Sequence, residues 1–211
     1  MTKTCAIIGC SPMCFPWGFD EEDEGCAALK LILINQISKL RGEGYMRFAV
    51  SMDCGVGLYV AEILHGLKES DGALGTICYV PYEEQATKWT PELRDRYFNA
   101  LAACTEVVNV ACEKTVGCEF KAHLEAMKDA DTLIAVFDPN NPHCEREAAA
   151  VAVAELLNKQ AFVLDPKAIT QLLDRRNGRA VVAATDHIVH GGLCDAADRA
   201  QLVNSQVSLC T

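Results

Sequence analysis

The stretch RFAVSMDCGVGLYVAEILHGL, residues 47–67, combines a short apolar run, a glycine-containing turn and a helical pattern. Its first five residues, 47–51, are typical of a buried β-strand. From Gly55 onward the apolar side chains recur at the spacing of one helical stripe, which indicates a helix with one face toward a core. A strand that leads through a tight turn into a helix is the repeating unit of a parallel α/β fold.

The same unit recurs along the whole chain, with apolar runs that predict strands and patterned segments between them that predict helices. The predicted strands are Thr4–Gly9, Arg47–Ser51, Leu74–Val80, Glu106–Val110, Thr132–Phe137 and Ala161–Leu164. The predicted helices are Cys26–Leu40, Gly55–Leu67, a segment that starts at Thr90-Pro91, a segment through Phe120 and Met127, Glu145–Asn158 and Ile169–Leu173. This alternation favours a doubly wound, mostly parallel Rossmann-like sheet with helices on both faces.

One domain is expected for residues 1–211, because 211 residues with 50% hydrophobic content can fill a single core. We expect its core to span about residues 4–173, and residues 174–211 to form a C-terminal elaboration in which Ala180–Ala184 is a candidate strand. No apolar run reaches the roughly 18 residues of a membrane span. The first residues also lack the pattern of a signal peptide, so we expect a cytoplasmic protein with no membrane partner.

Charge and cysteine content narrow the function classes further. The net charge of −10 and the lack of a Lys/Arg cluster argue against nucleic acid as a partner. Twelve cysteines in a chain of this length and apolar content predict mostly reduced thiols rather than a disulfide framework. Cys10 and Cys14 are the most closely spaced pair, no second such pair follows and the histidines are scattered, so no metal site is expected.

Ligands of open parallel sheets bind beyond the carboxyl ends of the strands, where the strand order reverses. The loops expected there are Gly9–Pro12, which includes Ser11, then Ser51–Gly57, Pro81–Trp89 and Asp138–Pro142. In the second loop, Gly55 and Gly57 admit close backbone approach, and the first N–H groups of the helix face an anion. A phosphate fits there, with Ser51 as a donor to it and Asp53 as an acceptor from a ribose hydroxyl. Glycines needed only for packing explain the same turn equally well.

The other loops offer weaker candidates. Tyr82, Glu83 and Trp89 put aromatic and acidic side chains at a strand end, where the rings can stack on a base. The alternative is a surface loop in which Trp89 covers the core. Asp138 follows a buried strand and either lines the same crevice or opens an ordinary turn.

The order of these elements, with Ser51–Gly57, then Pro81–Gln85 and Trp89, and a strand that runs into Asp138, resembles the YpsA-like branch of the SLOG superfamily over roughly Thr4–Leu173. The resemblance implies a Rossmann-like fold that binds nucleotides or their derivatives, such as ADP-ribose-like or NAD-like ligands. The family's first loop resembles Gly-x-Arg/Lys-Pro, whereas here Ser11 stands at the basic position. The related LOG phosphoribohydrolases carry a Pro-Gly-Gly-x-Gly-Thr loop, and its absence here argues against N-glycosidic cleavage.

Three functions are compatible with these patterns. The leading hypothesis is a sensor, with little or no catalysis, that binds a nucleotide-derived small molecule over Ser51–Gly57. The first alternative is a hydrolase of a nucleotide or of its N-glycosidic bond, in which Glu83 or Asp138 activates water. The second is an interaction protein that has lost its ligand. Self-association through apolar helix faces fits the sequence, although no interface is identified.

Overall fold

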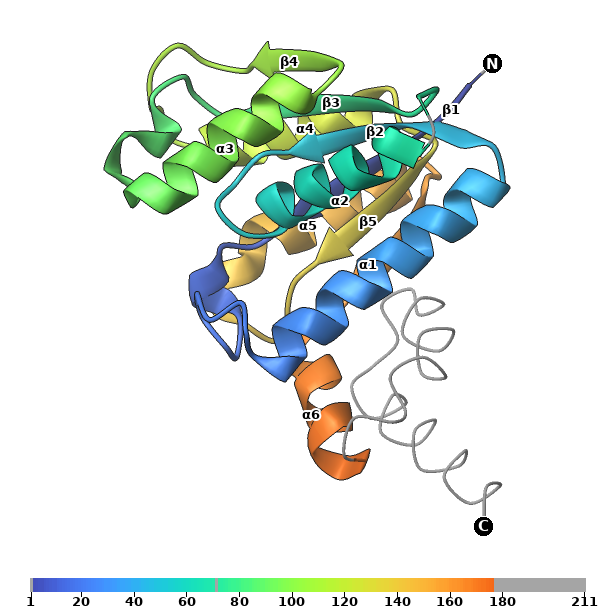
Figure 1. Cartoon of the computed structure of the whole chain (residues 1–211), viewed down its shortest axis with the longest axis vertical. Coiled ribbons are helices and arrows are strands. Elements are labelled where there is room, and N and C mark those ends of the chain that lie inside the picture. The colour runs from blue at the N-terminus through green and yellow to red at the C-terminus, as the bar shows by residue number, and fades with distance from the viewer. Residues whose placement is uncertain (1, 71, 177–211) are drawn as a thin grey trace.

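The computed structural model describes residues 2–70 and 72–176, which form a six-stranded parallel sheet (Figure 1). The strands lie in the order β4-β3-β2-β1-β5-β6. Their bounds are β1 (Lys3–Gly9), β2 (Tyr45–Ser51), β3 (Gly75–Val80), β4 (Glu106–Asn109), β5 (Thr132–Val136) and β6 (Gln160–Leu164). Every one of these strands begins and ends within two residues of its predicted bounds.

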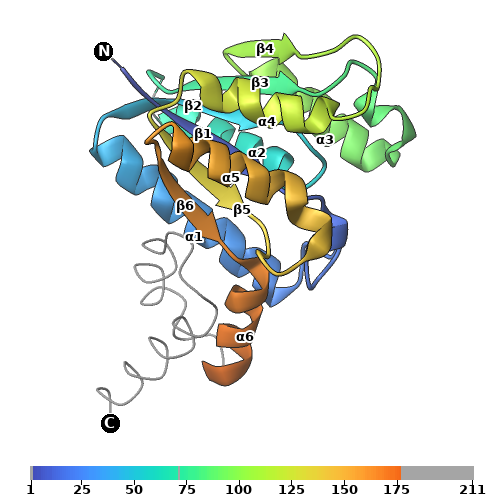
Figure 2. The same ribbon diagram turned by 180° about the vertical axis from the view of Figure 1, so that it is seen from behind.

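Helices cover both faces of the sheet. They are α1 (Glu24–Gly42), α2 (Val56–Ser70), α3 (Pro91–Ala103), α4 (Cys118–Lys128), α5 (Glu145–Leu156) and α6 (Pro166–Arg176). The helices α1, α2 and α3 lie on one face, and α4 and α5 lie on the other, as the two opposite views show (Figures 1 and 2). The predicted doubly wound Rossmann-like class is therefore confirmed.

Burial explains why the central strands are almost wholly apolar. Residues 4–9 of β1 and all of β5 are buried, since helices cover them on both sides. The parallel register places Ile7 of β1 between Val50 of β2 and Ile134 of β5. Because neither side of such a strand faces solvent, its sequence does not alternate between apolar and polar residues and is a continuous apolar run.

The strand order fixes where a ligand crevice belongs. The chain adds β2, β3 and β4 on one side of β1 and then places β5 on the other side, so the order reverses between β1 and β5. The turns that flank this reversal follow β1 and β5. The Ser51–Gly57 turn, which follows β2, therefore lies one strand away from the reversal.

Part of the predicted elaboration, including the candidate strand Ala180–Ala184, lies outside the described residues. Residues 174–176 form the last positions of α6. The extent of the domain over the whole chain stays a prediction. Within the part of the chain that the structure describes, no helix is both long and apolar enough to cross a membrane.

Candidate functional site

The turns after β1 and β2 touch each other at the carboxyl edge of the sheet. A side chain at Gly9 would overlap the side chain of Val56, the first residue of α2. A Cβ atom at Gly55 would stand 2.9 Å from Cδ of Pro12. Glycine at both positions lets the two turns meet, so residues from the predicted first and second loops form one continuous surface.

Gly57 lies where the first turn of α2 approaches the end of β2. A Cβ atom there would stand 2.5 Å from the carbonyl oxygen of Ser51 and 2.9 Å from Cα of Met52. Because both neighbours are backbone atoms, Gly57→Ala must displace the main chain. We expect this variant to lose about 1–3 kcal/mol of unfolding free energy, measured by urea denaturation.

Gly66→Ala is the matched control for this substitution. Gly66 lies in the same helix, and a Cβ atom added there would meet no atom within 4 Å. Alanine is the better helix former, so this variant should gain up to about 1 kcal/mol. Equal losses from the two substitutions would show that the packing of Gly57 is unimportant.

Asp53 caps the start of α2 with its own carboxyl group. Its Oδ1 accepts hydrogen bonds from the N–H groups of Gly55 and, at 3.2 Å, of Gly57. The N–H groups predicted to face a phosphate are therefore already bonded to an acid of this chain. A phosphate seated directly on them would be repelled by the ionised carboxylate, so the phosphate of a bound ligand must lie elsewhere on this edge or Asp53 must be neutral.

The second oxygen of Asp53 is buried as well. Oδ2 has no hydrogen-bond partner among the described residues. Burial raises the pKa of Asp53 to about 7, against the opposing effect of the Gly55 and Gly57 N–H groups. Nearby Glu147 raises the pKa further, whereas Arg146 lowers it. A carboxyl group that titrates near neutral pH can accept or donate a hydrogen bond at this free oxygen.

A buried polar chain connects β2 to the helices on the far face. Nδ1 of His123 in α4 lies 2.9 Å from Oγ of Ser51, and Nε2 lies 3.4 Å from Oε1 of Glu147 in α5. Ser51, His123 and Glu147 are 2%, 4% and 1% exposed. A serine, a histidine and an acid in this order also occur in hydrolytic triads. Here the serine is buried, so we assign a structural role to these three polar residues: they hold α4 and α5 against β2.

His123 and Glu147 were missed by the sequence analysis, although a local signal exists. Each stands on the buried stripe of its helix, where an apolar residue is expected. His123 lies three and four residues before the buried Ala126 and Met127. Glu147 lies three and four residues before the buried Ala150 and Val151. A polar residue at such a position needs a buried partner.

The remaining predicted residues lie in other surroundings. Ser11 accepts a hydrogen bond from the Met13 N–H at 3.5 Å in the 3-10 turn Pro12–Cys14. The ring of Trp89 packs edge-on against Tyr97 of α3 at 5.1 Å between centroids, which agrees with the reading in which it covers the core. The ammonium of Lys114 lies 5.6 Å from the centre of the Tyr82 ring.

The two candidate water-activating acids differ in burial. Glu83 is exposed on the loop after β3. Asp138 is 7% exposed, accepts a hydrogen bond from the Asn140 N–H at 2.8 Å and lies 3.9 Å from Nζ of Lys167. Asp138 thus accepts within its own turn, as a turn-opening aspartate does, and also faces Lys167 of α6.

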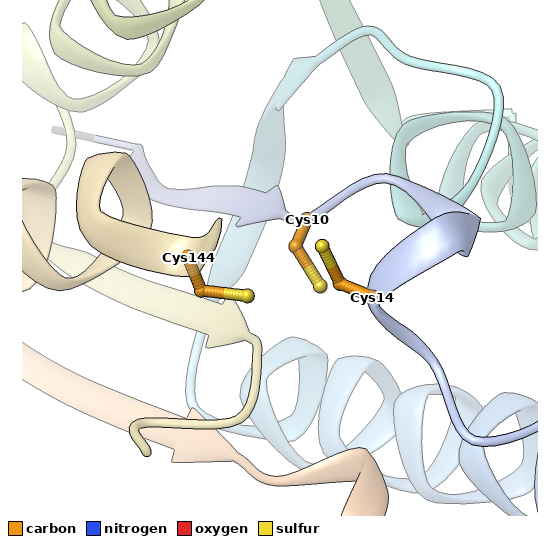
Figure 3. A group of neighbouring side chains, drawn as sticks. All are labelled: Cys10, Cys14 and Cys144. Atoms are coloured by element: carbon orange, nitrogen blue, oxygen red, sulfur yellow. The ribbon is translucent and has the colours of Figure 1, made fainter. Parts of the chain in front are cut away.

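Three cysteines meet at the reversal of strand order. The Sγ atoms of Cys10, Cys14 and Cys144 all lie within 4.8 Å of one another (Figure 3). Burial raises the pKa of Cys144 to about 12, and the Cys14 thiol raises it further, whereas a hydrogen bond with Cys10 lowers it. The short spacing of Cys10 and Cys14 is visible in the sequence, whereas Cys144 stands 130 positions further along the chain.

A shallow groove lies between α4 and α5, far along both helices from the carboxyl edge. It is lined by Leu124, Glu125, Met127, Lys128, Val153 and Leu157. None of these is a predicted site residue, so the groove has no bearing on the site described above.

The sheet topology and the edge geometry define a doubly wound α/β protein of the Rossmann-like class, with its candidate site beyond the carboxyl ends of the strands. Residues 5–167 match the YspA SLOG family (YpsA), and the chain belongs to that family. The resemblance found in the sequence is thereby confirmed.

The chain is also similar to two curated proteins. The chain is 30% identical over 102 residues to a UPF0398 protein of Bacillus licheniformis, a match that covers 48% of this chain and 55% of that protein. It is 25% identical over 126 residues to a UPF0398 protein of Halalkalibacterium halodurans, covering 59% of this chain and 67% of that protein. The chain thus spans little more than half the length of the first relative.

Proposed function

We propose that this protein is a cytoplasmic sensor that binds a nucleotide-derived small molecule at the carboxyl edge, over the Ser51–Gly57 turn. The observation that carries the proposal is the buried Oδ2 of Asp53, which has no hydrogen-bond partner among the described residues. A buried polar atom without a partner destabilises the folded protein unless a ligand or water forms a hydrogen bond with it. A ribose hydroxyl is a donor of the right kind.

The charged part of the ligand belongs beside Arg146. This residue lies in the first turn of α5, and its guanidinium is close enough to Asp53 to lower the pKa of that carboxyl group. Its side chain is 42% exposed and lies 3.6 Å from a carboxylate oxygen of Glu119, so it remains accessible to a phosphate. Arg146 thus supplies the positive charge that Ser11 does not provide in the first loop.

Ligand binding should depend on the ionisation of Asp53. A ribose hydroxyl that donates to Oδ2 binds the ionised carboxylate more strongly than the protonated acid, so binding favours release of the proton that Asp53 carries below its pKa of about 7. We therefore expect the affinity for a ribose-containing ligand to rise between about pH 6 and pH 8.

The test measures thermal shifts and dissociation constants with AMP, NAD and ADP-ribose, and with adenosine as the ligand that lacks phosphate. At least one phosphorylated compound should stabilise the protein. Asp53→Asn should weaken the binding of that compound by about 10- to 100-fold, because the hydrogen bond from the ligand to the charged carboxylate is lost. Arg146→Gln should weaken the phosphorylated ligands but not adenosine.

Lys39→Gln is the matched control, because it removes one positive charge from an exposed position of α1. It should leave every affinity unchanged. No shift with any compound, or full affinity in Asp53→Asn, would overturn the proposal. Chromatography of the same samples should return the ligand intact. Turnover that is lost in Glu83→Gln or Asp138→Asn with binding retained would favour the hydrolase instead.

A further inference from the structure

The three clustered cysteines come from two turns that flank the reversal of strand order. Cys10 directly follows β1, Cys14 ends the 3-10 turn Pro12–Cys14, and Cys144 ends a similar turn, Pro142–Cys144. Figure 3 shows their side chains directed toward one another. Cys10 and Cys144 are each 1% exposed, whereas Cys14 is only partly buried. The cluster therefore has two covered sulfurs and one that borders the surface.

The backbone at all three cysteines is fixed by hydrogen bonds. The N–H of Cys10 donates to the carbonyl of Val136 at 3.1 Å, which ties it to β5. The N–H of Cys14 donates to Ser11 at 2.9 Å, and that of Cys144 donates to Asn141 at 3.0 Å. The three Cα positions are set by the sheet and by two tight turns, so any closer approach of the sulfurs must come from side-chain rotation.

We propose that Cys10, Cys14 and Cys144 bind a thiophilic d10 cation, Zn2+ or Cu+, through three thiolates. Tetrahedral zinc with bonds of about 2.3 Å places its sulfur ligands about 3.8 Å apart. The present separations, all within 4.8 Å, need to close by at most about 1 Å. Soft thiolate ligands select these cations over the hard cations Mg2+ and Ca2+.

Binding is an exchange of protons for the metal, without any change of oxidation state. Each of the three thiols releases its proton to solvent as its sulfur bonds to the cation. Zn2+ with three thiolates carries one net negative charge and keeps a fourth position for water or a substrate atom. Cu+ needs no ligand beyond the three sulfurs. Cys144 is the N-cap of α5, so the positive end of that helix offsets part of the thiolate charge.

The proposed metal site adjoins the nucleotide turn but does not overlap it. Pro12 stands between Cys10 and Cys14 in sequence and contacts the position of Gly55 in space. A bound metal would hold the first loop against the start of α2. The two sites use different side chains, however, so each can be tested without the other.

The test uses the full chain, reduced and freed of metal. Zn2+ binding is measured by competition with a chromophoric chelator, Co2+ absorption reports tetrahedral thiolate coordination, and a Cu+ titration against a Cu+ chelator separates the two metals. We expect one equivalent of Zn2+ or Cu+ per chain. Cys14→Ser should weaken binding by roughly 100-fold, the share of one ligand in a structural site.

Other thiols are controlled with a Cys54→Ser/Cys112→Ser variant, which removes two cysteines that lie outside the cluster. Its affinity should equal that of the unmodified chain. Cys14→Ser is preferred as the main variant because Cys14 is the least buried of the three, and a Cys10→Ser/Cys144→Ser variant should lose binding completely. Metal affinity that falls in the Cys54/Cys112 variant instead, or no bound equivalent at all, would overturn the proposal. Nucleotide affinities measured on Cys14→Ser keep this result separate from the proposed function.

Discussion

His123→Ala is expected to lower the free energy of unfolding by about 3–5 kcal/mol at neutral pH. The substitution removes the contact of His123 Nε2 with the Glu147 carboxylate, which is 1% exposed and whose second oxygen already has no partner among the described residues. The hydroxyl of Ser51 loses its partner at the same time. A buried acid without a counter-group is among the most destabilising single defects in a protein. Urea denaturation at equilibrium measures the loss.

A double-mutant cycle with Glu147→Gln separates this effect from the lost volume of the ring. Glutamine removes the charge but keeps the shape, so His123→Ala should cost about 0.5–3 kcal/mol less in the Glu147→Gln background. His65→Ala is the control for a histidine on an exposed helix position and should change stability by less than about 0.5 kcal/mol. Equal costs of His123→Ala in both backgrounds would show that the Glu147 charge is not involved.

Asp53→Asn is expected to remove the pH dependence of stability that Asp53 imposes. The pKa of Asp53 is about 7 in the folded protein, raised chiefly by burial from 3.8. Between these two values the folded state binds a proton that the unfolded state does not, so stability falls as the pH rises through this window. Between about pH 5 and pH 8 this group should lower the unfolding free energy of the unmodified protein by about 2–3 kcal/mol. The loss is 1.36 kcal/mol for each pH unit below the folded-state pKa of about 7.

The measurement is the difference in unfolding free energy between Asp53→Asn and the unmodified chain at the two pH values. The asparagine oxygen can still accept from Gly55 and Gly57, but its NH2 group replaces the unpartnered Oδ2 and adds a cost that does not depend on pH. The difference should therefore move in favour of the variant as the pH rises. Asp95→Asn, at an exposed position of α3, controls for the change of charge. A difference that stays constant from pH 5 to pH 8 would falsify the shifted ionisation of Asp53.

Most of the fold could be predicted from the sequence because its signals are local. Buried parallel strands are continuous apolar runs, and β5 appears as such a run almost to the residue. The largest errors in helix bounds are of three residues, at the end of α2 and at both ends of α6. A smaller error is at α1, which begins at Glu24 because Asp23 caps it by accepting from the Gly25 N–H at 2.7 Å. Asp23 lies in the acidic segment 20–24, whose charges alone indicate a solvent-exposed loop.

The candidate site was only half predictable, because half of it is assembled over long chain distances. The turn that holds Ser51, Asp53, Gly55 and Gly57 is contiguous, and its place at a strand end follows from the alternation of elements. The groups around this turn come from distant parts of the chain. His123 stands 72 positions after its partner Ser51, and in the neighbouring cysteine cluster Cys144 stands 130 positions after Cys14. Periodicity reports which face of a helix is buried, but it does not report which residue of another helix lies opposite.

The edge strand β4 has a consequence for the behaviour of the protein in concentrated solution. It is only four residues long, begins with a charged side chain at Glu106 and is largely exposed. A short, charged edge offers few unpaired backbone groups to another chain and resists the growth of the sheet into larger assemblies. The protein should therefore resist aggregation by strand addition at this edge, even when molecules are crowded together.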